Sequence, residues 1–441
     1  KIPERLRLPS CEGEPRGAAG GTEHTHTSHF SRTCLAEKMR PSCKARLLAL
    51  LVVSLIGILP SLCAIAPAAA FAPPPCPSRG ALGVLSRGQG RLRAASRTGC
   101  RHEGFRMVDV SLGSEVASPR EALRQGSWFK LICGASNQDA PQIRNLALIY
   151  TLVGVDCIDC SADPAVVAAV CEGIDAASAV ARGRGDAEPM RPWVMVSIND
   201  DEDPHFRKAH FDPELCPADC PRPCEAVCPA SAIGSTGGVI DKKCYGCGRC
   251  IPVCPLGIVE AKSYTRSPLE VTSSLAQSSV DAVEIHTAGQ STEHLAALWG
   301  GIRPWASTLK LVALSFPDPG GDRLAAYMQE AFGVLSPPHT QEFLWQTDGR
   351  PMSGDIGRGT AHPSVAFARR AIEAKASHSI GGHVQLAGGT NGATADLVSR
   401  ASLFPNQALG HGIAGAAFGG HARKIILPTL EKLAERGHAD G

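Results

Sequence analysis

The chain has 441 residues, with 44 Lys and Arg against 42 Asp and Glu and a formal net charge of +2 at pH 7. The charge is uneven: residues 1–102 hold fifteen of the bases and five of the acids, which leaves 29 bases, 37 acids and a net charge of −8 in the remainder. This acidic body excludes a general nucleic-acid-binding protein, because phosphate binding needs a basic surface.

The first part of the chain is interpreted as a leader. The chain begins with Lys, so residues 1–38 are predicted to be a non-native upstream segment that precedes a start at Met39. A basic start, an apolar run and an alanine-rich end predict a signal peptide over residues 39–72. A membrane anchor is the alternative, because the run approaches spanning length. Six arginines and no acid in residues 73–102 predict a transit-peptide-like segment over residues 73–105.

A signal peptide followed by a transit segment resembles the bipartite plastid leaders of algae with secondary red plastids. We therefore expect the mature protein to lie in the plastid (chloroplast stroma) and to have no membrane span. A secretory leader alone would predict disulfides. The plastid stroma is instead a reducing compartment, in which cysteines stay available as thiolates.

Beyond residue 125, short apolar strands alternate with amphipathic helical segments, which predicts a parallel sheet. Eight such units within residues 125–435 fit a TIM-like (βα)8 barrel, and a doubly wound α/β sheet is the alternative. The expected strands are 129–133, 155–159, 193–198, 282–286, 309–316, 343–347, 383–387 and 412–418. The expected helices are 142–153, 164–181, 268–279, 292–300, 322–331, 361–375, 393–401 and 423–436.

Two runs of four cysteines, each closed by Cys-Pro, interrupt this alternation after the third strand. The second run matches C-x2-C-x2-C-x3-C-P, the ligand run of two-cluster ferredoxins, and the first run has one extra residue in each of its first two gaps. The segment is therefore predicted to be an inserted ferredoxin-type module over residues 200–265. In a barrel, the loop after the third strand lies on the carboxyl-terminal face, where active sites are found.

Three closely spaced cysteines can bind one face of a cubane, and the fourth reaches the partner cluster instead. We thus expect two [4Fe–4S] clusters. Structural zinc sites, which usually use two separated C-x2-C pairs, and disulfides are the alternatives. One predicted ligand set is Cys216, Cys220, Cys224 and Cys254, and the other is Cys244, Cys247, Cys250 and Cys228.

Two glycine-rich stretches follow the seventh and eighth strands, where barrels hold phosphate groups. They are candidate sites for a flavin or another phosphate ligand, and tight turns with close packing are the alternative. The candidate residues are Gly388, Gly389, Gly392, Gly415, Gly419 and Gly420. A third glycine-rich segment, residues 348–360, follows the sixth strand and is predicted to be either a lid over the mouth or an ordinary solvated loop.

Cysteines and histidines are scattered near the expected strand ends. Cys133, Cys157, Cys160 and His286 are expected near the barrel mouth, with the cysteines as small buried hydrophobes. The thiols of Cys157 and Cys160 should point to opposite faces of their strand. The remaining histidines beside the module, His205 and His210, are predicted to be surface residues.

Four segments of the body, together with both cysteine runs, are distinctive: SWFKLICGASNQD (127–139), IRNLALIYTLVGVDCID (143–159), DAVEIHTAG (281–289) and FLWQTDGRPMSGDIGRG (343–359). On these segments, the body of the chain resembles the light-dependent period protein A (LdpA) family of cyanobacteria and photosynthetic eukaryotes. The resemblance covers most of residues 125–435. It implies a two-cluster protein that senses the redox state of photosynthetic electron transport and, in cyanobacteria, passes it to the circadian clock through clock-input partners.

Two functions follow as expectations. The first is a redox sensor or electron carrier whose partner is a redox partner of photosynthetic electron transport or a regulatory protein. The second is an iron–sulfur oxidoreductase with a flavin or a small molecule in the barrel mouth. A purely structural iron–sulfur scaffold is a third option. The sequence contains no nucleophile motif or dinucleotide fingerprint, which favours a protein that is not a conventional enzyme.

Overall fold

A computed structural model describes residues 117–439, apart from 235–236, 266, 268–270, 273–278, 307, 351–356 and 405–411. The leader segments and most of the helix expected at 268–279 lie outside the described residues.

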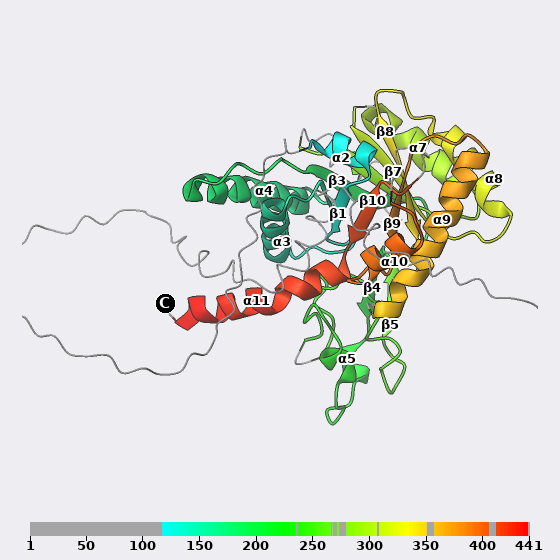
Figure 1. Ribbon diagram of the computed structural model, residues 1–441. Coiled ribbons are helices and arrows are strands. Elements are labelled where there is room, and N and C mark those ends of the chain that lie inside the picture. Colours follow the sequence, from blue (N-terminus) through cyan, green and yellow to red (C-terminus); the bar gives the residue numbers. More distant parts are fainter. Residues whose placement is uncertain are drawn as a thin grey trace, which may run out of the picture. The chain divides into compact units, whose positions relative to one another are not determined.

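Eight parallel strands close into a barrel in the order β1-β10-β9-β8-β7-β6-β3-β2 (Figure 1). The predicted TIM-like barrel is confirmed, and the doubly wound alternative is wrong. The strands are β1 (Trp128–Ile132), β2 (Cys157–Ser161), β3 (Trp193–Asn199), β6 (Ala282–His286), β7 (Leu311–Pro317), β8 (Glu342–Asp348), β9 (His383–Ala387) and β10 (Gly415–Phe418).

Helices follow the strands and cover the outside of the barrel (Figure 1). The first two of these helices, α3 and α4, begin at aspartate N-caps, Asp139 and Asp163, and end at left-handed glycines, Gly154 and Gly185. The helices are α3 (Ala140–Val153), α4 (Pro164–Arg184), α7 (Glu293–Ala306), α8 (Arg323–Leu335), α9 (Ala361–Ser377), α10 (Thr394–Arg400) and α11 (Gly420–Ala439). Within the described residues, α4 is long and apolar enough to cross a membrane, and here it packs against α3 and β2.

An additional helix, α2 (Pro119–Gln125), precedes the first strand and was not expected from the sequence. Ser118 and Glu121 form a capping box at its start. Its Leu123 packs with Trp128 and Trp193, which lie at the amino ends of β1 and β3. This helix therefore adds to the apolar core at the amino-terminal end of the barrel.

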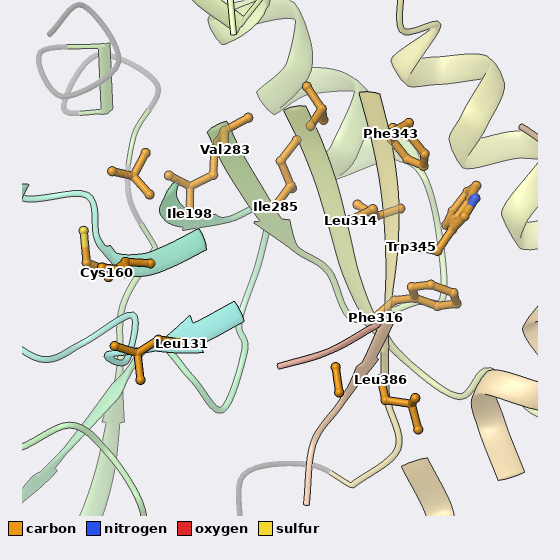
Figure 2. Close-up of a cluster of buried hydrophobic side chains, with 14 of the residues drawn as sticks. Leu131, Cys160, Ile198, Val283, Ile285, Leu314, Phe316, Phe343, Trp345 and Leu386 are labelled. Carbon is orange, nitrogen blue, oxygen red and sulfur yellow. The ribbon is translucent and has the colours of Figure 1, made fainter. Parts of the chain in front are cut away.

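The strands divide their side chains between two environments, because successive residues of a strand point to opposite faces. Val283 and Ile285 of β6 point outward into the layer between strands and helices, as do Phe316 and Trp345 (Figure 2). The alternate residues of β6, including Glu284, therefore point into the barrel. Polar groups that point into the barrel are removed from water, so they need hydrogen-bond or charge partners within this inner layer.

The two cysteines of β2 lie on opposite faces of the strand, as predicted. Cys157 belongs to the inner core and Cys160 to the outer layer. The expected position of Cys157 near the mouth is wrong, because it is the first residue of β2 and therefore lies at the amino-terminal end.

The cysteine segment leaves the barrel after β3 and returns to it before β6. A two-stranded antiparallel sheet of β4 (Arg207–His210) and β5 (Glu260–Ser263) forms its base. The 3-10 helix η2 (Pro213–Leu215) and the short helix α5 (Pro223–Ala226) lie between these two strands. Asn199, the last residue of β3, donates from Nδ2 to the carbonyl of Tyr264 at 2.9 Å and so joins the two ends of the insertion.

Candidate iron–sulfur centre

The cysteine module has a small apolar core of its own. Cys224 and Cys250, one from each run, are buried there with Phe211, Ile233 and Val259. The other six cysteines of the runs are half-buried or buried around it, and all eight are free thiols. The core thus brings the two runs together although 15 residues separate Cys228 from Cys244 in the chain.

One group of thiols consists of the first three cysteines of the first run and the last cysteine of the second. Burial raises the pKa of the Cys216 thiol, and the nearby thiols of Cys220 and Cys224 raise it further. Burial also raises the pKa of Cys224, and the neighbouring thiols that add to the effect are Cys254 and Cys220. Cys254 therefore lies beside the first run, as the predicted exchange of the fourth ligand requires.

The second group surrounds a pocket. Cys228, the last cysteine of the first run, lines this pocket together with Cys244, Cys247 and Cys250. Burial and the thiols of Cys247, Cys244 and Cys228 raise the pKa of Cys250 to about 12. Four thiols converging on one pocket, with Cys228 contributed by the other run, fit the donor set of a cubane.

Backbone amides are aimed at several of these sulfurs. The amide of Ala209 donates to Cys244 Sγ at 3.3 Å, and that of Ala232 donates to Cys228 Sγ at 3.2 Å. At Cys254, burial acts to raise the pKa, but the amides of residues 256–259 outweigh it and lower the pKa. Such amides stabilise thiolate and, in a loaded centre, shift the reduction potential upward.

Two glycines shape the loop of the second run. Gly246 and Gly248 have φ angles of 73° and 77°, in the left-handed region that favours glycine. A Cβ on Gly246 would also collide with the backbone of Arg207 on β4. The C-x2-C-x2-C spacing is therefore folded tightly against the base of the module.

The module is bound to the barrel by polar contacts on the β1–α3 loop. Tyr264 donates from its hydroxyl to Ser136 Oγ at 2.9 Å, and Lys208 donates to Gln138 Oε1 at 2.8 Å. The guanidinium of Arg423, from α11, lies 4.2 Å from the ring centre of Tyr245, which is within the second cysteine run. The thiol pocket is thereby in contact with the barrel through Tyr245.

The candidate phosphate glycines occupy different places. Gly388, Gly389 and Gly392 follow β9, and Gly419 and Gly420 follow β10, at the carboxyl ends where the prediction placed them. Gly415 is instead the first residue of β10 and pairs with Trp128, so it lies at the opposite end of the barrel. Its position does not fit phosphate binding.

Close packing accounts for Gly388. Its φ is +65°, and a Cβ there would collide with the Asp348 carboxylate. We expect Gly388→Ala to lower the free energy of unfolding by about 1–3 kcal/mol, measured by urea denaturation. Gly392→Ala is the control, because its Cβ would meet His421 at an ordinary 3.6 Å, and a change within ~0.5 kcal/mol is expected. Equal losses in both variants would contradict this explanation.

The barrel interior contains a buried ion pair that the sequence analysis missed. Lys130 Nζ contacts Glu284 Oε2, and both side chains are fully buried. Burial opposes charge on both groups, but their mutual attraction dominates, so the pKa of Lys130 is raised and that of Glu284 is lowered. The signal in the sequence is a charged residue in the middle of each apolar strand.

Polar side chains from neighbouring strands complete this layer. Gln346 donates from Nε2 to Glu284 Oε1 at 2.6 Å, and Gln385 donates to Gln346 Oε1 at 2.5 Å. On the other side, Ser197 donates to Asp159 Oδ1 at 2.7 Å. Burial and the charge of Glu284 raise the pKa of Asp159 to about 6.

His205, predicted to be a surface residue, is half-buried. Its ring lies between two carboxylates, with Nδ1 2.7 Å from Asp203 Oδ1 and Nε2 3.3 Å from Asp348 Oδ2. Burial lowers the pKa of His205, but the hydrogen bond to Asp203 and the carboxylate charges raise it to about 9. Asp348 belongs to the segment predicted as a lid or loop, of which residues 351–356 lie outside the described residues. His210, in contrast, is exposed as predicted.

The fold and the two cysteine groups indicate the class of the protein. It is a TIM-like barrel protein with an iron–sulfur cluster-binding module inserted at the carboxyl-terminal face of the barrel. Family comparison agrees: residues 216–265 match the LdpA Fe-S cluster-binding domain, and residues 274–440 match the Light dependent period A C-terminal domain. The chain is 47% identical over 319 residues to Light dependent period A of Synechococcus elongatus, which covers 72% of this chain and 86% of that relative. The chain belongs to the Light dependent period A family.

Proposed function

We propose that this protein binds two [4Fe–4S] clusters and acts as a redox sensor or electron carrier linked to photosynthetic electron transport in a plastid. The observation that carries the proposal is the division of eight thiols into two groups of four, each completed by a cysteine from the other run. Zinc sites usually use pairs of C-x2-C and do not need this exchange. Bound cubanes would supply one-electron transfer.

The two groups differ in their exposure to a partner. Leu215 and Leu256 are 62% and 50% exposed, and they lie next to Cys216 and two residues after Cys254. Both cysteines belong to the first group. A redox partner or a regulatory protein would therefore approach the first cluster, while Tyr245 holds the second one against the barrel.

Composition of the purified protein tests the proposal. Anaerobically reconstituted protein should contain about eight iron and eight acid-labile sulfide per chain, and reduction should produce the low-temperature EPR signals of two cubanes. A colourless sample that holds zinc would overturn the proposal.

A second function, an iron–sulfur oxidoreductase with a flavin or a small molecule in the barrel mouth, is favoured by the buried Lys130–Glu284 layer. The layer lies inside the barrel, at the middle residues of β1 and β6, and buried ionisable groups with shifted pKa values are candidates for ligand sites. Denaturing the purified protein and measuring released flavin fluorescence separates the two functions. Flavin release supports the oxidoreductase, and cubane spectra alone support the sensor or carrier.

A further inference from the structure

Three ligand-type side chains meet at the barrel mouth, apart from the cysteine module. Asp203 and His205 come from the segment between β3 and β4, and His286 is the last residue of β6. One donor atom from each lies within 4.8 Å of the others. Asp203 Oδ1 is central, because it lies 2.7 Å from His205 Nδ1 and 3.7 Å from His286 Nδ1.

The burial and the unsatisfied ring nitrogens of His286 indicate that a ligand belongs beside it. Its side chain is 5% exposed, and neither ring nitrogen makes a hydrogen bond. Nε2 lies 3.0 Å from Glu284 Oε1 but is not directed at it as a hydrogen bond. A buried imidazole without hydrogen bonds costs free energy, so a missing partner is expected.

Asp348 provides a second, independent sign. It ends β8, its Oδ2 lies 3.3 Å from His205 Nε2, and its buried Oδ1 has no hydrogen-bond partner. An ion pair of His205 with its two carboxylates accounts for the position of His205. It does not account for the unsatisfied ring nitrogens of His286, nor for Asp348 Oδ1, which lies against Gly388 without a hydrogen-bond partner.

We propose that Asp203, His205 and His286 bind one divalent first-row transition metal ion, with Asp348 beside it as a further ligand or as the acceptor for a bound water. Two imidazoles and a carboxylate suit such ions, and the set leaves coordination positions open. The ion would satisfy the buried imidazole and offset the charge of two carboxylates. Ligand atoms need to lie about 2.1 Å from the ion, so His205 would turn from its bond with Asp203 toward the ion.

The site lies outside the cysteine module, at the mouth of the barrel. It lies at the carboxyl ends of the strands, where barrels carry out chemistry, and Glu284 joins it to the buried layer around Lys130. His205 is 18% exposed, which leaves a path for an ion from solvent. Asp203 and His205 lie in the last four residues before β4, one of the two strands at the base of the cysteine module, so the metal would lie between the barrel and that module.

Binding of Mn²⁺ tests this inference, because Mn²⁺ prefers oxygen and nitrogen donors and does not compete for thiolates. Cluster-loaded full-length protein is kept oxidised, in which state its cubanes are EPR-silent, and is titrated anaerobically with Mn²⁺. Loss of the free Mn²⁺ EPR signal reports binding. We expect about one ion per chain, and a weakening of at least ~10-fold in His286→Gln and in Asp203→Asn.

The control is His294→Gln. His294 also faces an aspartate, with Nδ1 2.9 Å from Asp201 Oδ2, but its side chain is 64% exposed. This variant should bind Mn²⁺ as the wild type does, and acid-labile sulfide should be unchanged in every variant, which shows that the clusters and the fold persist. The inference would be overturned if the wild type failed to bind Mn²⁺ and, in a parallel titration, also failed to bind Zn²⁺. Unchanged Mn²⁺ binding in His286→Gln would overturn it as well. Both results concern the metal site alone, so they test this inference whether the protein binds one cluster or two.

Discussion

A double variant that pairs Cys254→Ser with Cys220→Ser is expected to keep one cubane intact, whereas Cys254→Ser with Cys247→Ser should damage both. The reason is the exchange of the fourth ligand: Cys254 lies with the first run, where it is a neighbour of Cys224. Two changes in one ligand set harm a single cluster, and one change in each set harms both.

Iron, acid-labile sulfide and EPR spin counts measure this outcome. The first double variant should retain roughly half of the wild-type iron and a full-intensity signal from the second cluster, and the other should retain neither signal intact. A matched pair of double variants uses the other exchanged residue, Cys228. Cys228→Ser with Cys247→Ser should damage only the second cluster, and Cys228→Ser with Cys220→Ser should damage both. The opposite pattern would mean that each run binds its own cluster.

Removing one partner of the buried ion pair should have the largest effect on stability. Lys130→Met leaves Glu284 as a charge inside the barrel, where it is fully buried. Breaking such a pair costs ~3–5 kcal/mol. Unfolding in urea, followed by tryptophan fluorescence, measures the change. The control is the pair of Lys310, which is 52% exposed, and the half-buried Asp281, at 2.6 Å. Lys310→Met should cost no more than about 1 kcal/mol, because Asp281 keeps its hydrogen bond from the Val194 amide and remains in reach of water.

A second variant separates charge from packing. Glu284→Gln combined with Lys130→Met removes both charges, and the new amide can still hydrogen-bond to Gln346. We therefore expect the double variant to be more stable than Lys130→Met alone. If it is equally unstable, packing of the lysine stem rather than the uncompensated charge is the cause.

Much of the fold could be predicted because local patterns agree with it. β6 and β9 were expected at the residues where the structure has them, since their apolar residues are bounded by turns. α2 was missed because it is only seven residues long and its signal is a capping box rather than a periodic apolar face. The start of α11 was placed three residues too late because glycines precede it.

The barrel mouth could not be predicted in the same way. His205 reads as a surface residue in the sequence, and only closure of the barrel brings it to Asp348, 143 positions later in the chain. Glu284 likewise meets Lys130 because β6 and β1 face each other across the interior. These contacts join residues that are far apart in the chain. Neither the spacing of residues along the sequence nor the composition indicates that such residues lie close together in space.

By itself, the sequence determined the alternation of strands and helices, the insertion after the third strand and the spacing of the eight cysteines, because periodicity and spacing are local properties of the chain. It left a barrel and a doubly wound sheet open. The tertiary structure decided which polar groups share the barrel interior, and that His286 is buried without a hydrogen bond beside Asp203. The physical reason is that burial, and the resulting demand for a charge or hydrogen-bond partner, exists only once distant strands have closed around a side chain.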